Sequence, residues 1–231
     1  MIQRKDEIFI ALKDAFPHTI PIMMGYLLMG FAFGVLLDKS GYDFVWAFFM
    51  SVFIYAGAMQ FVAIGLLASG IGIWSVVVLS AMVNARQIFY SISMLDRFSK
   101  MGKKLPYMIH SLTDETFALF NVKKPQEGTN ETYFMFFIAL LNHIYWIIGS
   151  LAGSLIGSKF SFDSRGVDFV MTAIFMVIFM EQWKHSSNHT PAIVGIFTSV
   201  ICLLLWGGSF LLPSLVLMTF ILMLLRKKLE C

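Results

Sequence analysis

The sequence predicts an all-α integral membrane protein with about seven transmembrane helices and a shorter re-entrant or interfacial helix near residues 105–120. Of its 231 residues, 58% are hydrophobic and only 13% are charged, whereas a soluble domain has about 25% charged residues. From Phe44 to Leu95 the only charged side chain is that of Arg86, and so long an apolar stretch belongs in a membrane. We therefore expect a single polytopic membrane domain over residues 1–231.

Seven apolar runs are the expected spans, with six or eight as the alternatives. They are Phe16–Leu37, Phe44–Leu66, Ile73–Leu95, Phe134–Gly157, Phe169–Trp183, Ala192–Trp206 and Phe210–Leu225. Residues 1–15 mix charged residues with an apolar stripe, which is typical of an amphipathic helix in the membrane interface. Residues 96–131 form the longest polar stretch, and we expect a cytoplasmic loop that contains a half-helix.

Basic residues set the expected orientation, because Lys and Arg accumulate in cytoplasmic loops. A cytoplasmic 96–131 stretch also leaves the basic C-terminal residues 226–228 inside. Counting the expected spans backwards then puts the N-terminus outside, although Arg4, Lys5 and Lys13 favour the cytoplasm. We expect an outside N-terminus on this count.

The segment Leu105–Phe120 has Pro106 where a helix would begin and helix-compatible residues behind it. As a helix it would be about 24 Å long, which is shorter than a hydrocarbon core of about 30 Å. We interpret it as a re-entrant or half-membrane helix. The alternative is a cytoplasmic helix on the membrane surface.

A polar face lies late in the third run. Arg86 and Tyr90 share one side of the expected helix, with Asn84 and Gln87 beside them. An arginine in hydrocarbon costs from about 3 to more than about 10 kcal/mol, so a buried Arg86 needs an acid, carbonyl groups, water or a substrate carboxylate. We interpret this face as the lining of a cavity. The alternative is that Arg86 snorkels to the membrane edge.

Two adjacent acids, Asp114 and Glu115, lie in the expected half-helix between Leu112 and Phe117. Neighbouring helix residues point about 100° apart, so one acid can pair with Arg86 or take a proton while the other faces the interface. The alternative is an ordinary solvated pair at the end of a basic loop.

The middle of the second run contains the segment Tyr55–Phe61, with Gly57 and Gln60 in it. Gly57 between two alanines permits close helix packing or local unwinding that frees carbonyl groups, and Gln60 offers both a donor and an acceptor. Ordinary small-residue packing explains the segment equally well. Glycines at four-residue spacing in 30–34 and 149–157 predict helix–helix contacts.

The sequence contains no serine-hydrolase elbow, zinc-protease motif, nucleotide-binding loop or Cys/His cluster. Cys202 and Cys231 give neither a disulfide framework nor a metal site. We therefore expect no enzyme activity, cofactor, metal ion or nucleic-acid partner. A chain that is nearly all membrane, with a few buried polar groups, is typical of a carrier driven by an ion or substrate gradient.

Several segments together resemble the AzlC family. They are Ala15–Pro21, Tyr55–Phe61, Asn84–Tyr90, Leu112–Ala118, Gly166–Phe175 and Glu181–Trp183. The resemblance implies the large subunit of a branched-chain amino-acid exporter in the bacterial cytoplasmic membrane, working with a small, separately encoded AzlD-type membrane subunit. Gln87 stands where the family often has a histidine or another polar residue after the arginine.

The expected function is a proton-coupled secondary exporter of leucine, isoleucine and valine, with methionine as a further candidate substrate. A zwitterion needs a cation for its carboxylate, expected to be Arg86, and an acid or carbonyl groups for its ammonium. The expected substrate-binding residues are Arg86, Gln60, Asn84, Tyr55, Gly57, Phe61 and Tyr90, and the expected proton-coupling residues are Asp114 and Glu115. The alternative is a scaffold or regulatory subunit whose small partner forms the pathway.

Overall fold

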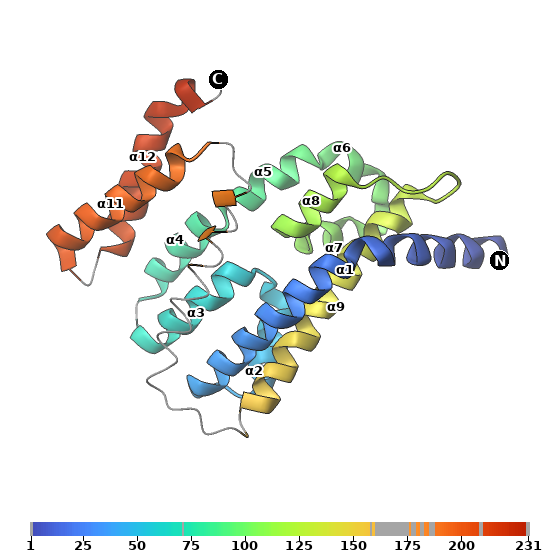
Figure 1. Ribbon diagram of the computed structural model, residues 1–231, viewed down its shortest axis with the longest axis horizontal. Coiled ribbons are helices and arrows are strands. Elements are labelled where there is room, and N and C mark those ends of the chain that lie inside the picture. The colour runs from blue at the N-terminus through green and yellow to red at the C-terminus, as the bar shows by residue number, and fades with distance from the viewer. Residues whose placement is uncertain are drawn as a thin grey trace. The chain divides into compact units, whose positions relative to one another are not determined.

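The computed structural model describes residues 2–70, 72–157, 159, 176, 179–180, 183–184, 188–207 and 210–229. Within these ranges every regular element is a helix (Figure 1), which confirms the predicted all-α class there. The chain divides into two compact units. Unit 1 contains Met1–Ile71 and Val83–Ser164, and unit 2 contains Gly72–Met82 and Arg165–Cys231. One domain over the whole chain stays a prediction.

Unit 1 contains most of the described helices. They are α1 (Ile2–Lys39), α2 (Phe44–Phe49), the π-helix η1 (Met50–Ile54), α3 (Gly57–Ser69), α5 (Ala85–Ser93), α6 (Leu95–Phe98), the 3-10 helix η2 (Ser99–Lys104), α7 (Leu105–His110), α8 (Asp114–Val122) and α9 (Glu131–Gly157). Unit 2 contains α4 (Ile73–Val83) up to Met82, α11 (Thr190–Trp206) and α12 (Leu211–Leu229).

The N-terminal segment and the first apolar run form one continuous helix. α1 has 38 residues and contains Pro17 and Pro21, and it is about 57 Å long, well beyond a hydrocarbon core of about 30 Å. Figure 1 shows that α1 changes direction along its length, which prolines inside a helix commonly cause. The amphipathic helix expected over residues 1–15 is therefore an extension of the first span.

α1 and α9 pack side by side and run in the same direction. His18 contacts Phe134 near the start of α9, with ring centroids 5.8 Å apart, and Gly34 contacts Gly153 near its end. A Cβ added to Gly34 would lie 3.0 Å from the Gly153 carbonyl carbon and 2.6 Å from the Ser154 nitrogen. The glycines therefore allow the two backbones to touch, and the helix contact predicted from their spacing is confirmed.

The second apolar run folds back on itself. After α1 ends, α2 and η1 return along α9 until the Ser51 carbonyl meets Nε2 of His143, 3.1 Å away. α3 then heads toward the C-terminal end of α1, where Phe61 packs edge-on against Phe33 with ring centroids 5.8 Å apart. We call this element the outer hairpin, which comprises Phe44–Ser69 with its tip at Tyr55–Ala56.

A second hairpin enters unit 1 from the opposite end. α7 begins beside the start of α9, where Nζ of Lys104 lies 3.6 Å from the centre of the Tyr133 ring. Three residues later the Tyr107 hydroxyl is 3.1 Å from Nδ1 of His143. The chain turns at Ser111–Thr113 and returns through α8. We call Leu105–Val122 the inner hairpin; the single helix expected near residues 105–120 is thus present as two shorter ones.

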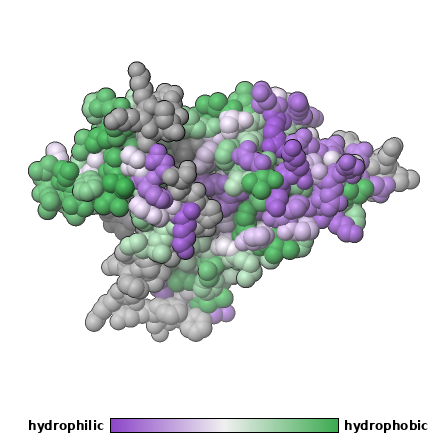
Figure 2. Space-filling view, turned by 45° about the horizontal axis from the view of Figure 1, so that its top comes forward, coloured by the Kyte–Doolittle hydropathy of each residue, from purple (hydrophilic) through white to green (hydrophobic). Residues whose placement is uncertain are grey.

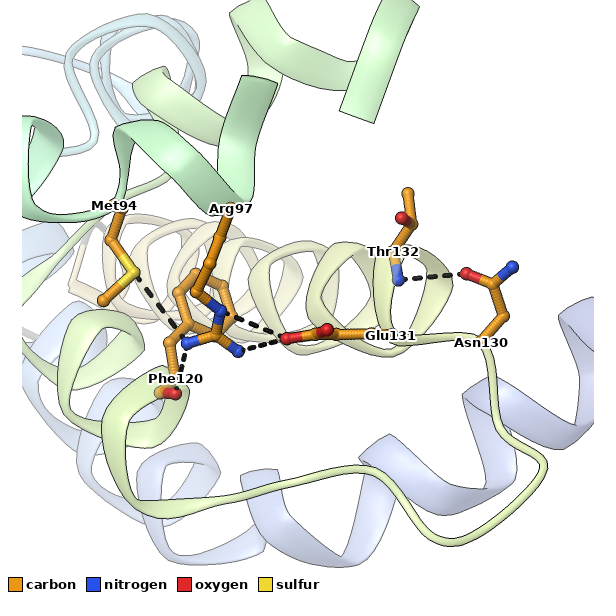
Figure 3. Close-up of polar contacts among 6 residues, drawn as sticks. All are labelled: Met94, Arg97, Phe120, Asn130, Glu131 and Thr132. Atoms are coloured by element: carbon orange, nitrogen blue, oxygen red, sulfur yellow. Dashed lines mark hydrogen bonds and ion pairs between the residues drawn. The ribbon is translucent and has the colours of Figure 1, made fainter. Parts of the chain in front are cut away.

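Arg97 holds the base of the inner hairpin (Figure 3). It donates to the Phe120 carbonyl at the end of α8 over 2.7 Å and, through Nε and Nη2, to Oε1 of Glu131 at the start of α9 over 3.1 and 2.7 Å. Asn130 caps the same helix by accepting from the backbone N–H of Thr132 over 3.0 Å. The hairpin is therefore anchored at its polar end and carries its tip into the apolar interior.

The expected placement of the N-terminus opposite the 96–131 stretch is wrong. Oδ2 of Asp14 accepts the backbone N–H of Gln126 over 2.9 Å, so the first part of α1 and the loop before α9 lie at the same end of unit 1. Hydrophilic residues cover this end in Figure 2. The error came from counting the outer hairpin as a full crossing. If the 96–131 stretch is cytoplasmic, the N-terminus is cytoplasmic too, as Arg4, Lys5 and Lys13 favour.

Two of the described helices are long and apolar enough to cross a membrane, Asp6–Lys39 and Glu131–Gly157, and the broken pair Ile73–Val83 with Gln87–Ser93 would make a third. In unit 2, α11 and α12 pack together (Figure 1), with Gly195 against Met218. The run expected at Phe169–Trp183 lies mostly outside the described residues. The count of seven spans is not confirmed, because the run expected to cross at Phe44–Leu66 is divided into shorter apolar helices, Phe44–Ile54 and Gly57–Leu67.

Candidate functional site

The tips of the outer and inner hairpins meet between α1 and α9. The Tyr26 hydroxyl of α1 lies 2.7 Å from Oγ1 of Thr113 at the inner tip. The Tyr26 ring is also edge-on to Tyr55 at the outer tip, with centroids 6.5 Å apart. Both hairpins and both long helices therefore contribute to one place. We call it the tip cluster, which comprises Tyr26, Tyr55, Thr113, Glu115, Thr116 and Asn142.

At the outer tip, some backbone carbonyls lack their usual helical hydrogen-bond donors because η1 is a π-helix. The N–H of Tyr55 makes an i to i−5 bond of 3.2 Å, and Tyr55 itself is left-handed, with φ 41° and ψ 44°. The carbonyls of Ser51 and Val52 thereby lose the i+4 donors of an α-helix. Nε2 of His143 and Nε2 of His110 lie 3.1 and 3.0 Å from them. Two imidazoles thus stabilise the interruption.

His143 links the outer tip to the inner hairpin. Its Nε2 must donate to the Ser51 carbonyl, which only accepts, and its Nδ1 can then accept from the Tyr107 hydroxyl. The His143 ring also stacks on Tyr55 with centroids 4.1 Å apart. A neutral imidazole protonated on Nε2 satisfies both hydrogen bonds, so this histidine has a clear structural role.

The inner tip is a capped helix N-terminus that carries an acid. Oγ1 of Thr113 accepts from the backbone N–H of Thr116 over 3.3 Å, and the Tyr26 hydroxyl donates to Oε2 of Glu115 over 2.6 Å. Nδ2 of Asn142 donates to Oγ1 of Thr116 over 3.0 Å. A chain of hydrogen bonds therefore connects α9, the inner tip, α1 and a carboxylate.

Gln60 is fixed by Trp146 beside the first turn of α3. Nε1 of Trp146 donates to Oε1 of Gln60 over 3.0 Å. The far edge of the same indole lies at Gly57, where an added Cβ would be 3.3 Å from it. Because an indole N–H can only donate, this contact fixes which end of the Gln60 amide is oxygen. The amide nitrogen therefore faces away from Trp146.

Buried polar atoms without partners gather around the tips. In the part of the chain that the structure describes, the Tyr55 hydroxyl, Nε2 of Gln60 and Oδ1 of Asn142 make no hydrogen bond. These residues are 2%, 0% and 0% exposed. A buried unsatisfied polar group costs about 1–3 kcal/mol, and several together indicate a place where a polar ligand can bind.

The tips bring together part of the predicted substrate set. Tyr55 forms the outer tip, Gly57 begins α3, and Gln60 lies one turn further on. Phe61 is fully buried and packs against Phe33. The substrate-binding roles predicted for these residues stay predictions. The helix is interrupted at Tyr55, in the segment where the sequence allowed for local unwinding.

The structure brings together fewer of the substrate-binding residues that were predicted in the third apolar run. Asn84 is half-buried between α4 and α5 and makes no side-chain cap. Tyr90 stacks on Phe117 of α8 with centroids 4.3 Å apart. The backbone of Arg86 is helical, but its side chain lies outside the described residues. Of the two predicted acids, Glu115 makes the contact with Tyr26.

Sequence reasoning overlooked Tyr26 and Trp146, and it gave no binding role to Thr113, Thr116 or Asn142. Asn142 is a polar residue within an apolar run, and this signal could have found it, whereas amphipathic aromatics such as Tyr26 and Trp146 are ordinary in membrane helices. What could not be inferred is that two tips, 58 residues apart at Val52 and His110, come together. No group of three or more His, Cys, Asp or Glu side chains that could hold a metal ion occurs in the described part of the chain.

The arrangement suits a ligand that carries both charges. The outer tip presents hydrogen-bond donors at Gln60 and at the start of α3, whereas the inner tip presents the Glu115 carboxylate. The Trp146 ring, which orients Gln60, also contacts the rings of Tyr26 and Phe33, with centroids 5.6 and 6.2 Å away. A small zwitterion with an apolar side chain would meet complementary groups at both ends.

Comparison with known proteins identifies the family. The profile described as AzlC protein matches residues 21–160. The branched-chain amino acid transport protein AzlC of Bacillus subtilis (strain 168) is 40% identical over 230 residues, which cover 99% of this chain and 91% of that protein. An uncharacterized membrane protein of Helicobacter pylori (strain J99) is 60% identical over 222 residues, or 96% of this chain and 97% of the relative.

A more distant relative is the inner membrane protein YgaZ of Escherichia coli (strain K12), which is 29% identical over 191 residues, covering 79% of this chain and 78% of that protein. No solved structure matches the chain. The relatives' descriptions and the long apolar helices agree on a multi-pass membrane protein. The chain therefore belongs to the AzlC family.

Proposed function

We propose that this protein exports branched-chain amino acids from the cytoplasm as the large subunit of a two-component, proton-coupled secondary transporter in the bacterial cytoplasmic membrane. The substrate class is supported by the name of the Bacillus relative, 40% identical over almost the whole chain. The mechanism is supported by one structural observation above all: two hairpins of half-length helices meet at buried polar groups between two long apolar helices. Interrupted helices of this kind bind substrates and ions in transporters.

The proposed coupling uses one carboxylate for two cations. Glu115 accepts from Tyr26 at the inner tip and can bind either a proton or the ammonium group of a substrate. Because one carboxylate cannot hold both, proton binding displaces the ammonium and ammonium binding displaces the proton. Alternate binding of this kind exchanges a proton for an amino acid, which allows the proton gradient to drive export.

The proposed substrate set keeps the residues expected from the sequence. Gln60 and Tyr55 contribute polar groups and Phe61 contributes apolar surface. Arg86 and Asn84 remain predicted contacts of the substrate. The small AzlD-type partner also remains a proposal, resting on the family resemblance.

The test is leucine efflux from loaded proteoliposomes that contain the purified chain, with and without a coexpressed small AzlD-type subunit. We expect efflux above that of protein-free liposomes, faster when the external pH is the lower one, and inhibited by isoleucine and valine. Lysine and glutamate inside matched liposomes serve as substrate controls. Leucine efflux no faster than that of protein-free liposomes, with and without the small subunit, would contradict the proposed function.

The alternative is that this chain is a scaffold and the small partner forms the pathway. The close glycine contacts between α1 and α9 suit a scaffold, whereas buried unsatisfied groups at the hairpin tips do not. Binding of radiolabelled leucine to this chain purified alone favours the carrier. Binding that requires the small subunit and survives substitution of Glu115 and Gln60 favours the scaffold.

A further inference from the structure

We infer that the first turn of α3, together with the side-chain amide of Gln60, binds the carboxylate group of the transported amino acid. The inference rests on the proposed function and deepens it, because it names the substrate group that the outer tip recognises. It also assigns to described residues a task that the sequence suggested mainly for Arg86.

The first turn of α3 has free donors. The first hydrogen bond of this helix runs from the N–H of Gln60 to the Ala56 carbonyl over 2.8 Å. The N–H groups of Gly57, Ala58 and Met59 therefore have no backbone acceptor among the described residues, and no side chain caps the helix. Free N–H groups and the positive end of the helix dipole favour an anion there.

Gln60 supplies an independent observation at the same turn. Its side chain is fully buried, yet Nε2 has no partner in the described part of the chain. Trp146 occupies the amide oxygen, so the unpartnered group is a donor and its orientation is fixed. Side chains on a helix lean toward its N-terminus, which is the direction of the free N–H groups.

Glycine keeps the turn open to a ligand. Trp146 covers one side of Gly57, where an added Cβ would lie 3.3 Å from the indole. Gly57 and Ala58 themselves stay half-buried rather than fully enclosed. A side chain at position 57 would displace the indole that orients Gln60. The absence of a Cβ therefore preserves both the donor geometry and the approach to the turn.

The two hairpins present groups of different charge, and this difference would orient a bound amino acid. The acid of the tip cluster, Glu115, belongs to the inner hairpin and is held by Tyr26, whereas the outer tip carries donors. A carboxylate would be repelled by Glu115 and attracted by α3, and an ammonium group would show the opposite preference. An amino acid thus binds with its carboxylate toward the outer hairpin and its ammonium toward the inner one.

The test compares leucine with leucinamide, which lacks the carboxylate charge, as ligands of the full-length chain in lipid nanodiscs. We expect wild type to bind leucine at least about tenfold more tightly than leucinamide, as for loss of a charge-assisted hydrogen bond. Gln60→Glu retains the acceptor for Trp146 and replaces the donor by an anionic oxygen. It should bind leucine at least about tenfold more weakly and leucinamide as well as wild type or better. Gln60→Met should weaken leucine binding and leave leucinamide binding unchanged.

Tyr145→Phe is the matched control. It removes a buried hydroxyl from the same helix as Trp146, and its partner Thr19 retains a bond of 2.8 Å to the Phe16 carbonyl. It should keep the wild-type preference for leucine over leucinamide. If wild type transports leucine but Gln60→Glu keeps the wild-type preference for leucine over leucinamide, the carboxylate assignment is overturned. The proposed function would then still stand. Loss of the preference in Arg86→Gln but not in Gln60→Glu would move the subsite to Arg86 and likewise overturn the carboxylate assignment.

Discussion

At the scale of single residues, Glu115 carries the clearest mechanistic prediction. Its carboxylate accepts from Tyr26, and the residue as a whole is exposed rather than buried, which suits a group that exchanges a proton. Glu115→Gln keeps the shape and removes the exchangeable charge. We expect pH-driven leucine efflux to fall to the level of protein-free liposomes, because no proton can then displace the substrate ammonium.

Exchange of internal for external leucine separates coupling from folding. This exchange needs no net proton movement. We expect Glu115→Gln to retain it at raised leucine concentrations, because the amide oxygen still accepts a hydrogen bond from the substrate ammonium but binds it more weakly than a carboxylate does, whereas an unfolded protein would lose the exchange. Glu127→Gln changes an exposed acid in the loop before α9 and should behave as wild type in both assays. A Glu115→Gln protein that still responds to the pH gradient would exclude Glu115 as the coupling residue.

The same residues show what a sequence can predict about a site. Gln60, Tyr55 and Glu115 could be singled out because a polar residue in an apolar run is costly and therefore conspicuous. Trp146 and Tyr26 could not, since amphipathic aromatics are ordinary in membrane helices. Their importance depends on pairings across 86 positions for Trp146 and Gln60, and 89 for Tyr26 and Glu115. Such pairings are set by tertiary packing.

At the scale of elements, the packing of α1 on α9 is the feature most open to a stability measurement. A Cβ at Gly34 would lie 2.6 Å from the Ser154 nitrogen and 3.0 Å from the Gly153 carbonyl carbon, and backbone cannot move aside as a flexible side chain can. We expect Gly34→Ala to destabilise the protein by about 1–3 kcal/mol, measured as the loss of thermal stability in detergent.

Gly25 in the same helix provides the matched control. An added Cβ there meets nothing within 4 Å, and alanine is the better helix former by about 1 kcal/mol. Gly25→Ala should therefore leave the unfolding temperature unchanged or raise it. Equal effects at both positions would show that the close contact between α1 and α9 does not limit stability.

Element boundaries mark where sequence prediction succeeded and failed. Long uniform runs gave α9 almost correctly, since its apolar length allows little else. The outer hairpin was misjudged as one span, because its two halves differ neither in hydropathy nor in composition. Gly57 marked this segment for local unwinding, but the apolar pattern does not show that a π-helical turn and the left-handed Tyr55 redirect the chain there. Their carbonyl partners, His110 and His143, are distant in sequence.

At the scale of the whole molecule, the two hairpins suggest a mechanism for access. One hairpin descends from the end of α1 and the other rises from the start of α9, and each ends at the tip cluster. Movement of either hairpin would open the cluster toward its own side only. If the proposed transport function holds, such hairpin movements would give alternating access, while the close glycine contacts keep α1 and α9 packed together.

Topology is the whole-molecule property that most directly tests this arrangement. The hydrogen bond between Asp14 and Gln126 places the N-terminus and the loop before α9 on one side, and the turn after α1 must lie on the other.

In a background in which Cys202 and Cys231 are replaced by serine, we expect Ser40→Cys to react in whole cells with a membrane-impermeant maleimide. Glu7→Cys and Glu127→Cys should react only after the membrane is permeabilised. Labelling of Glu7→Cys together with protection of Glu127→Cys would place the start of α1 and the start of α9 on opposite sides. Parallel packing of these helices would then be impossible, and with it the meeting of the two tips.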